Sequence, residues 1–316
     1  MSPAALAVDA GQTEIRATLA DGERGPTALA TAPGVPRMGE RVGAEEVARA
    51  IVAAVAELGP LPGAVPLAGV GLSGFEAASE DELARMGELL RRRLSLGGIA
   101  IASDGLTSLL GALGAEDGAV VAAGTGTVCV ARRGERLVKV DGWGALLGDA
   151  GSGFAIGRAG LESALRHADG RGGSEPLLRA AERRYAPVPE LSEHIYAAAV
   201  PTRAIAAFAA DVAAAADLGD ADAVAILARA ADELALSACA ALERLFGPGE
   251  PGVVSYAGNV FRAGALLVEP FTRAVGARRP GTEVVPPAGD ALAGAALLAG
   301  SGAPLRPEPG ILWTAP

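Results

Sequence analysis

Lysine is almost missing from this chain. Among its 316 residues Lys139 is the only one, and arginine supplies the other positive side chains. A Walker A loop requires Gly-Lys followed by Ser or Thr, and the sequence contains no such segment. The protein-kinase signature requires its own strand lysine within a fixed set of motifs, and that set is absent too. Two common ways of binding ATP are therefore excluded.

Cysteine, aromatic residues and long apolar runs are also scarce. The two cysteines, Cys129 and Cys239, are too few for a metal or cluster framework, and we interpret both as small buried side chains. No apolar run is long enough to span a bilayer, and no charged segment followed by an apolar one precedes the first strand. A cytoplasmic protein without a membrane partner is expected. The net charge of −10 gives a nucleic-acid partner no electrostatic help, so none is expected.

The chain does contain a repeated glycine turn between apolar strands. Residues 121–130 form an apolar strand, a Gly124–Thr127 turn and a second apolar strand, and residues 5–19 repeat this pattern around Gly11–Thr13 about 115 residues earlier. Such a turn has little side chain in the way, which suits a phosphate lying close to the backbone. Two such turns on two halves of the chain suggest a nucleotide held in a cleft between them.

Each half of the chain predicts the same order of elements. A meander of three antiparallel strands is followed by helices that alternate with short strands, which is an α/β pattern given twice. We predict an N-terminal domain over 1–114, a C-terminal domain over 115–300 and a proline-rich tail over 301–316. The expected strands are 4–9, 15–19, 27–31, 67–72, 98–103, a hairpin over 119–131, 136–140, 253–257 and 284–285. The expected helices are 42–58, 80–94, 106–113, 155–168, 174–185, 189–199, 201–217, 220–246, 260–276 and 291–299.

Two aspartates at strand ends are candidates for chemistry. Asp9 ends the first strand, where its carboxylate would face phosphates and hold Mg²⁺ through water; the alternative is an Asx turn. Asp104 follows a strand and precedes a helix. It could accept the proton of a substrate hydroxyl that attacks a phosphoryl group. It could instead cap the helix, a role that Ser103 could also fill.

A glycine-rich stretch from Asp141 to Phe154 indicates a close approach of the backbone to another group. Trp143 could stack on a sugar or fill the core. Asp149 could bind a hydroxyl or cap the next helix, for which Ser152 is a competing cap. Further along, Gly258 and Asn259 could border an adenine or form an ordinary strand-to-helix turn. The small-residue helix after Asp290 predicts very close packing on another helix.

Together these segments resemble the actin-like sugar kinases of the acetate kinase–hexokinase–actin superfamily. They are most similar to the N-acetylglucosamine kinase branch, which shares a domain family with the BadF/BadG/BcrA/BcrD ATPases. Five segments carry the resemblance, in the family's order: 8–13, 102–105, 123–127, 142–153 and 258–261. It implies an α/β protein with a duplicated ribonuclease H-like (actin-like ATPase) fold and a nucleotide cleft between two domains.

The resemblance also implies roles for individual residues. Asp104 would be the catalytic base, and Asp9 would position Mg²⁺. The phosphates of ATP would be held by Gly11, Gln12, Thr13, Gly124, Thr125, Gly126 and Thr127. Adenosine would contact Gly258 and Asn259. The sugar would be bound by Ser73, Asp104, Gly142, Trp143, Gly144 and Asp149.

The implied activity is ATP- and Mg²⁺-dependent phosphorylation of a small amino sugar, N-acetylglucosamine to its 6-phosphate, by a homodimer. Two departures from the family pattern bear on the sugar: Ala150 stands where an acidic residue is common, and the loop 32–39 offers Arg37 but no asparagine. Glucosamine, N-acetylmuramic acid or an anhydro sugar are therefore alternative substrates. An activator-type ATPase and a non-catalytic sugar sensor are the alternatives to a kinase.

Overall fold

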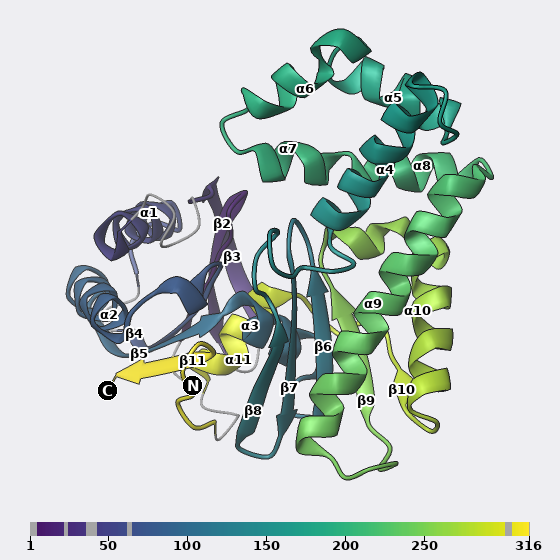
Figure 1. Cartoon of the computed structure of the whole chain (residues 1–316). Helices are drawn as coiled ribbons and strands as arrows, with labels where there is room; N and C mark the ends of the chain where they lie inside the picture. Colours follow the sequence, from purple (N-terminus) through teal and green to yellow (C-terminus); the bar gives the residue numbers. More distant parts are fainter. Residues whose placement is uncertain (1–4, 22–24, 36–42, 62–64, 301–304, 316) are drawn as a thin grey trace. The chain divides into compact units, whose positions relative to one another are not determined.

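The computed structural model describes residues 5–21, 25–35, 43–61, 65–300 and 305–315 (Figure 1). The strands are β1 (Ala5–Ala10), β2 (Glu14–Asp21), β3 (Gly25–Pro33), β4 (Val65–Leu72), β5 (Leu96–Ser103), β6 (Gly118–Ala123), β7 (Thr127–Arg133), β8 (Arg136–Asp141), β9 (Val253–Ala257), β10 (Glu283–Val284) and β11 (Leu312–Ala315). The helices are α1 (Ala44–Ala56), α2 (Glu80–Leu94), α3 (Asp104–Leu113), α4 (Gly153–Ala168), α5 (Glu175–Arg184), α6 (Val188–Tyr196), α7 (Pro201–Ala207), α8 (Ala209–Asp217), α9 (Ala221–Leu245), α10 (Ala265–Arg278) and α11 (Ala291–Ala299). Two short 3₁₀ helices are η1 (Phe75–Ala77) and η2 (Asn259–Ala263).

The strands form two sheets that repeat one order of neighbours. The six-stranded sheet has the order β11-β5-β4-β1-β2-β3, and the five-stranded sheet has the order β10-β9-β6-β7-β8. Apart from β11, the first five strands of the chain and the next five therefore have the same arrangement. This repeat confirms the predicted duplication of a ribonuclease H-like, actin-like α/β fold.

The chain divides into two compact units. Unit 1 comprises residues 1–120, 130–138 and 286–316, and unit 2 comprises residues 121–129 and 139–285. The chain thus returns to unit 1 after β10, where α11 packs on α3, β1 and β4. The domain limits that we expected at 114 and 300 stay a prediction.

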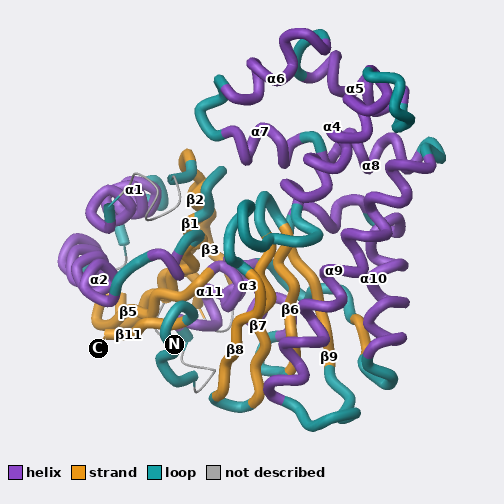
Figure 2. Tube along the Cα trace, viewed as in Figure 1, coloured by secondary structure: helices purple, strands orange, loops and turns teal. Residues whose placement is uncertain are grey.

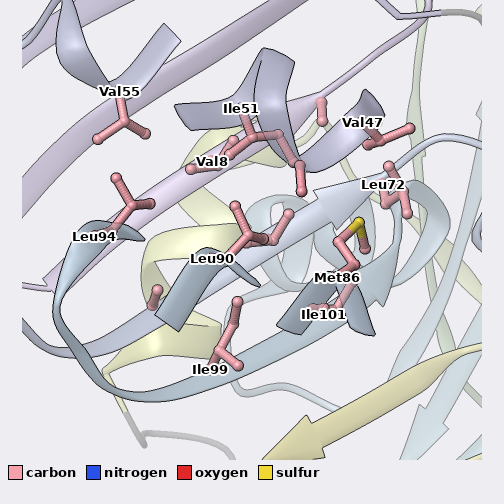
Figure 3. Close-up of a cluster of buried hydrophobic side chains, with 14 of the residues drawn as sticks. Val8, Val47, Ile51, Val55, Leu72, Met86, Leu90, Leu94, Ile99 and Ile101 are labelled. Carbon is pink, nitrogen blue, oxygen red and sulfur yellow. The ribbon is translucent and has the colours of Figure 1, made fainter. Parts of the chain in front are cut away.

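Unit 1 is built around β1, whose side chains alternate between two faces of the sheet. Leu6, Val8 and Ala10 lie in the larger core, whereas Ala7 contacts α11 on the other face. Apolar residues at helical spacing on α1 and α2 complete the larger core; Figure 3 shows Val47, Ile51, Val55, Met86, Leu90 and Leu94 with side chains of the sheet. Both faces of β1 are therefore buried ahead of Asp9, which explains why the strand is apolar from Ala5 to Val8.

Strand β11 was not expected in the proline-rich tail. It pairs antiparallel with β5, with Leu312 opposite Ala102. The ring of Trp313 lies so close to Gly87 of α2 that a Cβ at position 87 would be 2.6 Å from it. The tail is therefore held by strand pairing with β5 and by an aromatic contact, neither of which its own sequence predicts.

Unit 2 contains the helices from α4 to α10, of which α9 and α10 run side by side (Figure 2). Three helical predictions in this unit were wrong in their limits. The helix expected over 189–199 ends at Tyr196. The helix expected over 201–217 is divided at Phe208 into α7 and α8. The helix expected from residue 260 begins at Ala265, because Gly264 has φ +61° and ψ −137°, which no helical residue adopts.

Candidate functional site

The carboxyl ends of three neighbouring strands in unit 1 bring predicted site residues to one edge of the sheet. Strand β1 pairs in parallel with β4, and β4 with β5, so that Ala10 lies opposite Leu72 and Leu72 opposite Ser103. Asp9, Ser73 and Asp104 stand at or just beyond these ends. The backbone N–H of Ser73 donates to the Ala10 carbonyl at 3.1 Å. This edge is where open α/β sheets bind ligands.

Asp104 is not used to cap its helix. Ser103 is the N-cap of α3, and its hydroxyl accepts from the Leu106 backbone N–H at 3.2 Å. The Asp104 carboxylate instead accepts a hydrogen bond from the Ser73 hydroxyl at 2.7 Å. Burial raises the pKa of Asp104 to about 6, although the Ser73 hydrogen bond opposes this rise. A carboxylate whose pKa lies near neutrality suits a general base.

Asp9 makes an ion pair rather than an Asx turn. Arg16, which lies opposite Asp9 in the β1–β2 pairing, donates from Nη2 to the Asp9 carboxylate at 2.6 Å and from Nη1 to Asp290 at 2.5 Å. Asp290 is also the N-cap of α11 and accepts from the Ala293 backbone N–H at 3.0 Å. Burial raises the pKa of Asp9 against the opposing effect of Arg16. One guanidinium therefore connects β1, β2 and the start of α11.

Sequence reasoning assigned no role to Arg16 and interpreted Asp290 only as part of a closely packed helix. The packing prediction is confirmed: a Cβ at Gly294 would lie 1.8 Å from the Thr107 carbonyl oxygen of α3. Arg16 could have been found from the hairpin register, because an arginine opposite Asp9 is a cross-strand pair of opposite charges. Its contact with Asp290, 274 residues away, has no local signal.

The two glycine turns use some of the backbone N–H groups that were expected to face phosphate. Gly11 donates to the Glu14 carbonyl at 3.0 Å, and Gly124 donates to the Gly126 carbonyl at 2.9 Å. The N–H groups of these two glycines are therefore used for hydrogen bonds within their own turns. The backbone of Gly34 lies against Gln12 and Thr13, which supports the first turn, since the Gly34 N–H donates to Thr13 at 3.0 Å.

In unit 2 the second turn contacts the start of α4. The backbone N–H groups of Gly153 and Phe154 donate to the carbonyls of Gly124 and Thr125 at 2.8 and 3.1 Å. Thr127 is buried, and its hydroxyl has no hydrogen-bond partner among the described residues. A buried hydroxyl without a partner is costly, and a water, an ion or a ligand can supply the missing hydrogen bond.

We define the glycine loop as residues 141–153, from the last residue of β8 to the first residue of α4. Ser152 caps α4 by accepting from the Ala155 N–H at 3.2 Å, so Asp149 is released from that role. Asp149 is buried, and its carboxylate lies against Gly126, where a Cβ would be 2.6 Å from its Oδ2 atom. The structure thus brings together two predicted segments, the second phosphate turn and the sugar-site aspartate. Only a glycine at 126 permits this approach.

Trp143 does not fill the core, because 71% of its surface is exposed. Its ring lies 5.6 Å from the Lys139 ammonium group, a cation–π distance. A hollow of about 240 Å³ adjoins the glycine loop and α4. It is lined by Ala145, Gly148, Phe154, Ala155, Arg158, Ala159 and Glu162. Stacking of Trp143 on a sugar stays a prediction.

The remaining predicted residues stand as follows. Gly258 has φ +95° and approaches Ala123 at the end of β6, where a Cβ would lie 2.3 Å from the Ala123 carbonyl oxygen. It therefore lies next to the residue that precedes Gly124, while Asn259 begins η2. Their contact with adenine stays a prediction. Arg37 lies outside the described residues.

The two cysteines stand apart from any grouping of His, Asp or Glu side chains in the part of the chain that the structure describes. Within it, no group of three or more His, Cys, Asp or Glu side chains could hold a metal ion. Cys129 is buried, and burial raises the pKa of its thiol. Cys239 is only partly buried, and burial raises the pKa of its thiol too. Across the described residues, no helix has both the length and the apolar character needed to cross a bilayer.

Comparison with known proteins gives a family and a fold. The sequence model of the BadF/BadG/BcrA/BcrD ATPase family matches residues 6–299. An N-acetylmuramic acid/N-acetylglucosamine kinase of Clostridium acetobutylicum is 29% identical over 242 residues, which cover 73% of this chain and 76% of the relative.

Solved structures agree with this result. A Chromobacterium violaceum protein provisionally named N-acetylglucosamine kinase is 26% identical, with a TM-score of 0.73 over 94% of this chain and 99% of that one. A ROK family glucokinase of Streptomyces griseus, solved with glucose and AMPPNP, is 20% identical, with a TM-score of 0.60 over 94% of this chain and 98% of that one. At that identity the glucokinase supports the fold alone.

Proposed function

The chain belongs to the BadF/BadG/BcrA/BcrD ATPase family, and we propose that it is an ATP-dependent kinase of an amino sugar, with N-acetylglucosamine as its substrate and the 6-phosphate as product. One observation carries the proposal. At the ligand-binding edge of the unit 1 sheet, Asp104 is released from helix capping by Ser103 and held by the Ser73 hydroxyl, with a pKa of about 6.

Asp104 would act as the general base. The sugar hydroxyl oxygen forms a bond to the γ-phosphorus of ATP while the bond from that phosphorus to the leaving oxygen of ADP breaks. The hydroxyl proton passes to the Asp104 carboxylate. Such a base contributes about 10²- to 10⁴-fold to the rate. Asp149 and the glycine loop would bind hydroxyls of the sugar.

The phosphates of ATP would be held at the two glycine turns, Gly11–Thr13 and Gly124–Thr127. The buried Thr127 hydroxyl without a partner fits this proposal, because a bound ligand would supply the missing hydrogen bond. Asp9 would act toward Mg²⁺ through water, because proteins usually hold this ion by one or two carboxylates together with water and substrate phosphates. The Asp9 carboxylate accepts from Arg16 at 2.6 Å, so the ion and the guanidinium would share it. The ion would neutralise charge on the transferred phosphoryl group.

The two non-kinase alternatives have less support. An activator-type ATPase bridges an iron–sulfur cluster with cysteines, but Cys129 is buried in β7 and Cys239 lies within α9. A non-catalytic sensor does not require a carboxylate of raised pKa at the sheet edge. Ala150 and the loop 32–39 depart from the family pattern at positions that bear on the sugar, so the assay compares several acceptors.

The test is sugar-dependent release of ADP from MgATP, with N-acetylglucosamine, N-acetylmuramic acid, glucosamine and an anhydro sugar as acceptors. Asp104→Asn is the test variant, and Asp217→Asn, at an exposed aspartate that ends α8, is the matched control. We expect turnover with an N-acetyl sugar, lost in Asp104→Asn and kept in Asp217→Asn. Hydrolysis of ATP without any sugar, equal in all three proteins, would contradict the proposal.

A further inference from the structure

Asp141, the first residue of the glycine loop, has a backbone conformation that residues other than glycine rarely adopt. Its φ is +66°, and that of Asp149 is +58°. Among the described residues the only other non-glycine position with positive φ is Ser95, at the end of α2. Such conformations persist where surrounding contacts hold them, and they occur often at functional sites. The contacts that hold Asp141 therefore decide what it does.

The Asp141 carboxylate is the acceptor that links the start of the glycine loop to Asp149. Its Oδ1 atom accepts from the backbone N–H of Gly142 at 3.0 Å and from the backbone N–H of Asp149 at 3.1 Å. Gly148 allows this closure, because a Cβ there would lie 3.0 Å from the same oxygen. Asp141 thus binds the backbone of the aspartate whose own carboxylate lies against Gly126 in the phosphate turn.

The other carboxylate oxygen of Asp141 reaches a long helix. Ser237 of α9 donates from its hydroxyl to Oδ2 of Asp141 at 3.2 Å. Nearby, Arg244 of the same helix donates to the Lys139 carbonyl at 2.8 Å, which fixes the end of β8 just before the loop. Hydrogen bonds to an ionised acceptor are the stronger kind. The loop is therefore anchored to α9 through Asp141.

We propose that Asp141, anchored by Ser237, is a positioning residue that sets the place of Asp149 and with it the affinity for the sugar. Asp141 itself need not touch the substrate. The link from Asp149 to the sugar rests on the proposed function, whereas the link from Asp141 to the loop does not. Sequence reasoning missed both residues, since Asp141 appeared only as the start of a glycine-rich stretch and Ser237 lies inside an alanine-rich helix.

The test compares side-chain removal at two residues of the same backbone conformation. Asp141→Ala and Ser95→Ala both leave an alanine at positive φ, so both carry the backbone strain, but only the first removes the acceptor of the loop. We expect Asp141→Ala to raise the KM and the calorimetric dissociation constant for N-acetylglucosamine about 10- to 100-fold, because hydrogen bonds to a charged group are lost. Its kcat and its KM for MgATP should change less than about threefold.

Two further variants separate positioning from folding. Asn tolerates positive φ and keeps one accepting oxygen, so Asp141→Asn should recover most of the sugar affinity. Ser237→Ala, which keeps the carboxylate but removes its anchor, should give an intermediate loss. If Ser95→Ala and Asp141→Ala weaken sugar binding equally, or if Asp141→Asn is as poor as Asp141→Ala, the positioning role is wrong.

A second readout does not depend on sugar turnover. Trp143 and Trp313 are the two tryptophans of the chain, so in a Trp313→Phe background the fluorescence anisotropy decay reports on Trp143 and the glycine loop alone. We expect Asp141→Ala to increase the fast component of this decay, and Ser95→Ala to leave it as in the parent. If Asp141→Ala makes the loop move faster but the protein phosphorylates no sugar, the proposed function is wrong and the role of Asp141 in the loop stands. An unchanged decay would overturn the role itself.

Discussion

Removal of the Ser73 hydroxyl should move the pH dependence of the reaction. The hydroxyl donates to the Asp104 carboxylate at 2.7 Å and so stabilises its ionised form. In Ser73→Ala the carboxylate stays buried but loses this donor. Its pKa should therefore rise further above the value of about 6 that burial already produces.

The size of the effect follows from the energy of a charged hydrogen bond. Such a bond contributes about 1.5–3 kcal/mol. Since about 1.4 kcal/mol corresponds to one pH unit, the acidic limb of kcat/KM should move upward by about one to two pH units. In the wild type this limb should have its midpoint near the Asp104 pKa of about 6, because the base is active only when it is ionised.

The assay is the profile of kcat/KM for the sugar between pH 5 and pH 9, measured by ADP release with saturating MgATP. Ser73→Thr keeps a hydroxyl on the same strand end and serves as the control; its profile should stay close to that of the wild type. A Ser73→Ala profile with an unmoved midpoint would refute the argument, because it would mean either that Asp104 is not the titrating base or that the hydrogen bond does not act on it.

Three other predictions concern Asp104, Gly294 and Arg16, which all lie in unit 1. Asp104→Asn should lose about 10²- to 10⁴-fold in kcat and should melt at a higher temperature than the wild type at pH 8 but not at pH 4. The reason is that the pKa of Asp104 is about 6 in the folded protein and about 4 in the unfolded chain. Between these pH values the unfolded chain loses the proton while the folded protein keeps it, so the folded protein becomes less stable as the pH rises. Gly294→Ala places a Cβ 1.8 Å from a carbonyl oxygen of α3 and should lower the free energy of unfolding by at least about 2 kcal/mol in denaturant titrations. Its control is Gly276→Ala in α10, where a Cβ has open space; this change should raise the free energy of unfolding by about 0.5–1 kcal/mol. Arg16→Gln should lower unfolding stability by about 1–3 kcal/mol and change the Mg²⁺ concentration for half-maximal rate; equal Mg²⁺ curves would show that the ion pair with Asp9 has no part in the metal site.

Most of the architecture was predictable because it depends on local pattern. The helix expected over 80–94 has those limits in the structure, where Ser79 and Glu82 form a capping box that the sequence already displays. The repeated strand–turn–strand segments were predictable because alternation and glycine turns act within a few residues. Strand β11 was not, because its stability comes from pairing with β5, about two hundred residues earlier in the chain.

The candidate site was predictable to the extent that its residues lie in short motifs. Asp9, Asp104 and Asp149 stand out by their places at strand ends and between glycines. The residues that hold them do not: Arg16 bridges to Asp290, and Ser237 comes from a helix almost one hundred residues after Asp141. Contacts of this kind depend on the folded structure, and a single sequence has no pattern that reports them.

The structure also shows how a sequence can release an aspartate from helix capping. An aspartate at the start of a helix is ordinarily a good cap, so a functional carboxylate there competes with the helix for its own oxygens. In both units a serine takes the cap instead: Ser103 caps α3 beside Asp104, and Ser152 caps α4 three residues after Asp149. The Asp104 carboxylate then accepts from the Ser73 hydroxyl, and the Asp149 carboxylate lies against Gly126. By this argument a serine that caps a helix within three residues of an aspartate favours a role for that carboxylate other than capping.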